Sequence, residues 1–205
     1  MPARSTRRPI LNSRLRAVLA RLCEQLGPMY STQAVKLPYL VDVVAKQVLG
    51  HTVANATYQA WEHGVVAREV FRFIKHEAAS DDLFKVQSHQ YSESGQRISL
   101  AKKPGKNQPL TAEELAVVDF VAETYGHLPF DELGLLTKRL NTEIPPEEWG
   151  SNRPAALDDE TFLRLSPEWQ SLSQRISDAD LTDRSQWSAP INDNPREYFR
   201  RMLNA

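Results

Sequence analysis

The chain has little of the residue types on which metal sites and nucleotide-binding sites depend. It contains one cysteine, Cys23, and eight glycines among 205 residues. A single cysteine excludes an internal disulfide and a zinc site made of cysteines alone. Because Cys23 falls within an apolar helical pattern, we interpret it as a small core side chain rather than a reactive thiol. The glycines form no G-x-G-x-x-G and no lysine-containing phosphate loop, so the sequence shows no nucleotide-binding motif.

Long apolar runs are missing as well. No run approaches the roughly 20 residues that a membrane-spanning helix needs. The basic start, MPARSTRRP, is not followed by the apolar core of a signal peptide. We therefore expect a cytoplasmic protein without a membrane partner.

Motifs for catalysis or metal binding are absent from the sequence. The five histidines make no H-x-x-x-H pair, and no G-x-S-x-G occurs. Adjacent carboxylates stand at 81–82, 113–114 and 147–148. At helix ends and in loops, such carboxylates stabilise helix N-termini or remain hydrated. We therefore predict a protein that is not an enzyme and that uses neither a cofactor nor a metal.

The charge is unevenly distributed along the chain. Residues 1–50 carry eight Lys/Arg against two Asp/Glu, whereas residues 141–205 carry seven against twelve. A basic N-terminal part is compatible with contact to DNA or to an acidic partner. It is also compatible with the solvated face of a helix, which we favour because aromatics do not alternate with the arginines. A DNA-binding regulator that represses its own operon stays open as an alternative function.

Hydrophobic periodicity predicts a mainly α (α+β) fold, a compact helical domain with a small antiparallel β-hairpin. Apolar residues three and four positions apart indicate helices in five segments. The first covers residues 12–26, and the second runs from a Ser31-Thr32 cap to Gly50. The third begins at Gly64, the fourth follows the Thr111/Glu114 capping box, and the fifth is the stretch PFDELGLLTKRL. Pro38 would kink its helix unless it fell in the first turn. Alternating residues in FKVQSHQY and RISLAKK, around a turn with Gly95, predict the hairpin.

Composition divides the chain into three parts. Residues 1–11 read as a disordered basic N-terminus, because they offer little to bury. Residues 12–150 form the predicted domain. Residues 151–205 read as an acidic, Pro-rich extension with weak helical pieces near 166–177 and 194–203. We consider this extension a candidate for additional partner contact.

Two stretches of the domain carry a resemblance to a known family. VKLPYLVDVVAKQVLG and AWEHGVVAREVF resemble the "KLxKLLYLA" and "AWxYGPVxxxVY" motifs of the SocA-like Panacea domain, found in bacterial and phage-associated antitoxins. Further on, Tyr125-Gly126 precedes a helix with Leu133 and Thr137, as in the closing helices of that family. The sequence departs from the pattern at three positions, which are Pro38, His63 and Val65. The resemblance covers about residues 12–150.

The resemblance implies a protein-binding antitoxin of a toxin–antitoxin system. Family members neutralise a toxin encoded beside them by direct binding, and some members deliver the toxin to a protease. The expected partners are therefore a cognate toxin and, for an adaptor, a bacterial protease. Toxins differ widely across the family, so the sequence does not name this one.

The segment YQAWEHGVVAREVFRFIKHE contains the candidate partner-binding residues. The bulky Trp61 would bury its ring, and Gly64 would let the backbone reverse into the next helix. A rigid aromatic beside arginines is also the usual composition of a binding hot spot. We therefore predict a partner-binding patch at this corner, composed of Trp61, His63, Gly64, Arg68 and Arg72.

Overall fold

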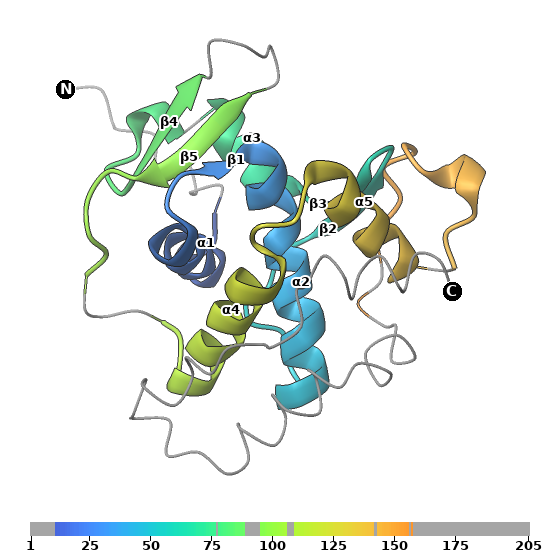
Figure 1. The fold of residues 1–205 in the computed structure, drawn as a ribbon, viewed down its shortest axis with the longest axis horizontal. Coiled ribbons are helices and arrows are strands. Elements are labelled where there is room, and N and C mark those ends of the chain that lie inside the picture. Colours follow the sequence, from blue (N-terminus) through green and yellow to red (C-terminus); the bar gives the residue numbers. More distant parts are fainter. Residues whose placement is uncertain are drawn as a thin grey trace, which may run out of the picture.

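The computed structural model describes residues 11–76, 78–88, 95–105, 109–141, 143–155 and 157. The elements are, in chain order, α1 (Ser13–Leu26), β1 (Met29–Tyr30), α2 (Ser31–Leu49), β2 (Tyr58–Trp61), β3 (Gly64–Ala67), α3 (Arg68–His76), η1 (Ala78–Ser80), β4 (Phe84–Ser88), β5 (Gln96–Leu100), α4 (Ala112–Tyr125), α5 (Phe130–Arg139) and η2 (Pro146–Glu148). The fold is mainly helical with small antiparallel sheets, which confirms the predicted class. Figure 1 shows α2 in the middle, with β4 and β5 on one side and α5 on the other.

Helix α2 is the centre of the domain. Every residue from 34 to 45 is buried, and the helix contacts α1, α3, α4, α5 and strands β1, β3 and β5. Pro38 lies in the helix interior rather than in the first turn. The Tyr58 hydroxyl lies 2.9 Å from the Pro38 carbonyl oxygen and 2.7 Å from Asp42 Oδ2, so this part of α2 is tied to β2. The helix starts at Ser31 and not after it, because Gln33 Oε1 accepts from Tyr30 N at 2.9 Å.

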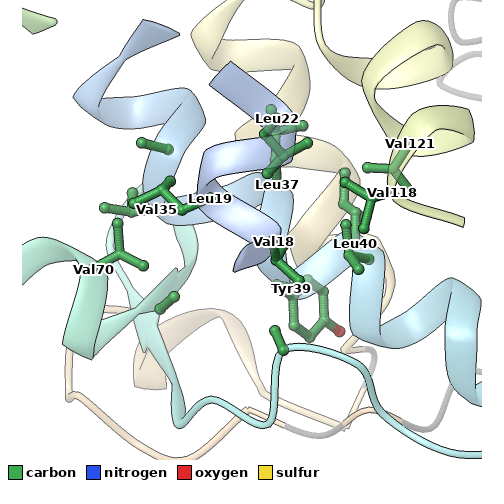
Figure 2. Close-up of a cluster of buried hydrophobic side chains, with 14 of the residues drawn as sticks. Val18, Leu19, Leu22, Val35, Leu37, Tyr39, Leu40, Val70, Val118 and Val121 are labelled. Atoms are coloured by element: carbon green, nitrogen blue, oxygen red, sulfur yellow. The ribbon is translucent and has the colours of Figure 1, made fainter. Parts of the chain in front are cut away.

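One apolar core joins the helices. Figure 2 shows its centre, where side chains of α1, α2, α3 and α4 gather: Val18, Leu19, Leu22, Val35, Leu37, Tyr39, Leu40, Val70, Val118 and Val121. The predicted inward stripe of α1 is buried from Leu15 to Leu22. Leu11 is also buried in this core, at 3% exposure, so the packed domain begins before the boundary that composition suggested. Cys23 is buried too, and burial raises the pKa of its thiol to about 12.

The predicted hairpin is confirmed as β4 and β5. The strands pair antiparallel from Phe84 with Leu100 to Ser88 with Gln96. Strand β1 extends the sheet to the order β1-β5-β4, through the pair Met29 and Ile98. The sequence pattern did not reveal β1, because a two-residue strand is too short to show an alternation.

Helix α4 starts where the capping box predicted it. The Thr111 hydroxyl accepts from Glu114 N at 3.3 Å, and the Glu114 carboxylate accepts from Thr111 N at 2.9 Å. Glu114 is only 3% exposed and also binds the guanidinium of Arg14 and the ring of His51. The cap therefore ties α4 to α1 and to the loop after α2.

The arginines of α1 are engaged in ion pairs and do not form a free solvated face. Arg16 binds Asp81, with Nη1 and Oδ2 2.6 Å apart. Arg21 is 9% exposed, and its Nε and Nη2 each lie 2.6 Å from an oxygen of Asp119. The expectation of a hydrated basic face was wrong here, because carboxylates distant in sequence fold against this side of α1.

Breaking the pair between Arg21 and Asp119 should destabilise the domain. We expect Arg21→Met to lower the free energy of unfolding by about 2 kcal/mol, since it leaves a largely buried carboxylate without its bidentate partner. Urea unfolding measures this change, and Arg68→Met, at an exposed position, serves as the control. The double variant Arg21→Met/Asp119→Leu should lose less free energy of unfolding than the sum of the losses in the two single variants. Additive losses would show that the pair contributes nothing.

The chain after α5 packs back on the domain. Ile144 is 4% exposed, and Trp149 packs against the core. Residues 153–155 run along β2: Ala60 N donates to the Arg153 carbonyl at 2.8 Å, and Ala155 N donates to the Tyr58 carbonyl at 3.1 Å. Figure 1 shows this segment in orange beyond α5, next to β2 and β3. The predicted helical pieces near 166–177 and 194–203 lie outside the described residues, as do residues 1–10.

Candidate functional site

The corner at Trp61 is a β-hairpin and not the start of a helix. Strand β2 pairs with β3, with Trp61 opposite Gly64 and only Glu62 and His63 between them. The prediction that a helix begins at Gly64 was wrong by four residues, since α3 begins at Arg68. Gly64 has φ +101°, a conformation that residues with a side chain rarely adopt. The glycine therefore closes a two-residue turn.

The turn fits tightly against α5. Thr137 receives a hydrogen bond from Val65 N at 3.0 Å and donates its hydroxyl to the Gly134 carbonyl at 3.0 Å. A side chain at Gly64 would collide with Thr137 Oγ1 and would come within 2.7 Å of the Gly134 carbonyl oxygen. Thr137 and Gly64 thus pack directly against each other and join two segments that are more than 70 residues apart in sequence.

A buried lysine holds the other side of the turn. Lys36 is 1% exposed, and its ammonium donates to the His63 carbonyl at 2.5 Å and to the Val65 carbonyl at 3.4 Å. Burial, together with the nearby charge of Lys138, lowers the pKa of Lys36 to about 8. In the part of the chain that the structure describes, no carboxylate lies within ion-pair distance of this ammonium. The positive charge is stabilised by these backbone carbonyls and by the Phe130 ring, whose centre lies 5.9 Å from Nζ.

A groove of about 1130 Å³ opens beside the turn. Five regions of the chain line it: the start of α2, the β2–β3 hairpin, the later part of α3 from Phe71 to Lys75, the start of β5 and the segment that leads into α5. Tyr30 and Phe130 lie on its wall at 40% and 42% exposure. Among the described residues, these are two of the three large hydrophobic side chains that are exposed, the third being Leu135. Exposed apolar surface is therefore concentrated at this groove.

Aromatic rings in the groove wall are packed edge to face. The Trp61 and Phe71 ring centres lie 4.7 Å apart, and those of His63 and Phe130 lie 5.4 Å apart. Such packing holds the rings in fixed positions, so a partner would find a rigid surface at little cost in side-chain entropy.

The predicted patch is divided by the structure. Trp61 and His63 line the groove, and Gly64 is buried beneath the turn, where it shapes the corner. Arg68 and Arg72 are exposed, but they are not among the groove residues. They are four residues apart on α3, and Lys75, one turn beyond Arg72, lines the groove together with Phe71 and Ile74.

Tyr30, Lys36 and Phe130 were not among the predicted site residues. Each lies far from the Trp61 corner in sequence and reaches it only through the fold. One signal was present in the sequence: Phe130 stands at the first position of a helix, outside the stripe of Leu133, Leu136 and Leu140, which are all buried. An aromatic residue off the buried stripe indicates an exposed contact surface.

The remaining unusual side chains of the described residues have structural roles. Asp42 is fully buried and accepts from Val53 N, Ala54 N and the Tyr58 hydroxyl at 2.7, 2.6 and 2.7 Å. Burial raises the pKa of Asp42, while these three donors act in the opposite direction. Asp42 thereby fixes the loop between α2 and β2. Within the described ranges, His, Cys, Asp and Glu form no group of three or more that could hold a metal ion.

Membrane insertion of a helix finds no support in the described part of the chain. None of its helices combines the length and the apolar character that crossing a membrane requires.

The comparison with protein families gives one match. The family described as "Antitoxin SocA-like, Panacea domain" matches residues 35–142, more than half of the chain. The matched region contains most of the groove residues, among them Lys36, Trp61 and Phe130, while residues 30–33 of the groove precede it. Neither the curated proteins nor the solved structures gave a match. The chain belongs to the family of antitoxins with a SocA-like Panacea domain.

Proposed function

We propose that this antitoxin neutralises a cognate toxin by binding it directly, and that the toxin docks in the groove beside the Trp61–Gly64 turn. The observation that carries the proposal is the gathering of exposed Tyr30 and Phe130 around fixed rings in a single groove. Binding hot spots are typically aromatic side chains in a well-packed pocket with cations nearby. The role is non-catalytic, in agreement with the family relationship.

The size of the groove favours a protein partner. Small-molecule sites usually have volumes of roughly 300–1000 Å³ and bury most of their ligand. This groove, at about 1130 Å³, exceeds that range and has two half-exposed aromatics on its wall. Such a shape suits side chains from a helix or loop of another protein.

DNA binding by the N-terminal helices has less support. Arg14, Arg16 and Arg21 are all paired with carboxylates of this chain, so they are not available to phosphates unless those pairs break. We therefore do not propose DNA as the partner. Delivery of the toxin to a protease, which the resemblance implies for some members, stays a prediction without an assigned surface.

The contribution of the acidic C-terminal extension also stays a prediction. Because residues 153–155 bond to β2, a truncation at 150 would remove part of the packed domain along with the extension. A truncation after Leu157 would leave that pairing intact and would test the extension alone.

Co-expression with the neighbouring open reading frames tests the proposed function. We expect one neighbour to be toxic alone, and to be harmless and co-purified when this protein is present. If no neighbour is toxic and none co-purifies, neutralisation by direct binding is contradicted.

A matched pair of variants on α5 tests the groove as the binding site. Phe130→Ala should weaken toxin binding at least about tenfold, because it removes an exposed anchor from the groove wall. Leu135→Ala removes a side chain of similar exposure, 45%, that is not part of the groove, and should leave the affinity within about twofold. Titration of the purified toxin by calorimetry measures both. Equal losses of affinity in the two variants, or a loss only in Leu135→Ala, would show that the toxin binds another surface.

A further inference from the structure

Positive side chains outnumber negative ones in the groove. Two lysines, Lys36 and Lys75, line it, and Glu62 is the single carboxylate among the groove residues. The whole chain has a net charge of −1, so this positive surface is a local feature and not a reflection of composition.

The positive charges lie against aromatic rings. Lys75 Nζ is 5.4 Å from the centre of the Phe71 ring, and Lys36 Nζ is 5.9 Å from that of Phe130. Beside the groove, the Arg97 guanidinium lies 4.2 Å from the centre of the Tyr30 ring. Rings of this kind hold a cation and keep water away from one of its sides, which strengthens its field on a bound group.

Carboxylates of the chain leave these lysines unneutralised. Of the ion pairs between described residues, none includes Lys36 or Lys75. The arginines of α1 provide a contrast, because each of them has a carboxylate partner. The groove thus combines apolar walls with positive charge that lacks an internal counter-charge.

We infer that the groove takes an acidic segment of a protein partner, in which a leucine, phenylalanine or tryptophan is flanked by aspartate or glutamate. The apolar side chain would pack between the Trp61–Phe71 pair and Phe130, and the carboxylates would lie toward Lys75 and the positive end near Lys36. The inference rests on the proposed function, since the segment would belong to the toxin. It adds the chemistry by which one toxin is accepted and another rejected, because a basic segment would face like charge.

A displayed library of random peptides tests this chemistry without the toxin. Selection on the full-length protein should enrich peptides with an aromatic or leucine residue beside acidic residues. The affinity of an enriched peptide should fall several-fold when salt is raised from about 0.05 to about 0.5 M, as the attraction is screened. Enrichment of basic or uncharged peptides, or no enrichment, overturns the inference.

Charge-reversal variants locate the charge. Lys75→Glu should weaken an enriched acidic peptide roughly five- to tenfold, because it replaces a groove cation by an anion. Lys103→Glu makes the same change at an exposed position outside the groove and should alter the affinity less than about twofold. A loss in Arg72→Glu without a loss in Lys75→Glu would place the peptide outside the groove and overturn the inference.

The two hypotheses fail in different ways. A toxin that binds equally well to wild type and to Lys75→Glu would contradict the acidic segment and leave neutralisation by direct binding intact. Acidic peptides that require Lys75, with no toxic neighbour that binds, would keep the groove chemistry and contradict the proposed function.

Discussion

Gly64→Ala should lower the free energy of unfolding by about 2–6 kcal/mol. Two causes add. A residue with a side chain at φ +101° carries backbone strain of roughly 1–3 kcal/mol. The new methyl group would also meet Thr137 Oγ1, the Gly134 carbonyl oxygen at 2.7 Å and Lys36 Nζ at 3.0 Å, and overpacking of this kind costs typically 1–3 kcal/mol. The Gly134 carbonyl is backbone and cannot rotate away. Urea unfolding followed by circular dichroism measures the loss.

Gly50→Ala separates the two causes. Gly50 has φ +75° at the end of α2, and a methyl group there would meet nothing within 4 Å. Gly50→Ala should therefore lower the free energy of unfolding only by the backbone strain, about 1 kcal/mol. If Gly64→Ala costs no more than Gly50→Ala, the tight contact between the turn and α5 is wrong. Since typical domains are stable by only about 5–15 kcal/mol, the full effect at Gly64 would remove a large share of the stability.

Helices were predictable here because each buries a continuous stripe of apolar residues. Leu133, Leu136 and Leu140 are inward as the spacing of α5 indicated, and the Thr111/Glu114 box marks the start of α4. Strands β2 and β3 were not predictable in this way. Each has four residues, and all four of β3 are buried, so alternation is absent and the pattern runs on into α3. Only pairing and the contacts from Lys36 and Thr137 decide that this stretch is a hairpin.

The candidate site was half predictable for a similar reason. Trp61 and His63 could be proposed because they stand in a recognisable motif. Phe130 joins them through packing of α5 on β3, and Tyr30 through packing of α2 on β3; local sequence encodes neither contact. Arg68 and Arg72 were assigned to the patch because arginines beside a rigid aromatic are typical of binding hot spots. In the structure they are exposed outside the groove, and Lys75 is the α3 cation that lines it.

The stability of the protein should rise with pH between about 8 and 10.5 through Lys36. The pKa of this lysine is lowered from 10.5 to about 8 in the folded protein, chiefly by burial. Below pH 8 both states hold the proton, so the cost of burying the charge is constant. Between the two pKa values the unfolded chain binds a proton that the folded protein has lost, so stability increases with pH. A shift of this size corresponds to about 3 kcal/mol in total.

Lys36→Met supplies the reference for that increase. Cys23 and Tyr58 act in the opposite direction at alkaline pH, because burial raises the pKa of both side chains. They are present in both proteins, so their effects cancel when the two stability curves are subtracted. The difference between wild type and Lys36→Met should grow by about 3 kcal/mol from pH 8 to pH 10.5 in favour of wild type. An NMR titration of the lysine Cε signal gives the pKa independently.

Parallel stability curves for wild type and Lys36→Met would contradict the buried charge of Lys36. They would show that the Lys36 ammonium keeps an ordinary pKa and is therefore hydrated or neutralised in the folded protein. The His63 and Val65 carbonyls would then not be its main partners, and its charge would not be available to a bound segment. A growing difference would show that the charge is buried without an anion. An acidic peptide bound in the groove should then raise the Lys36 pKa in the NMR titration, since a nearby carboxylate favours the protonated form.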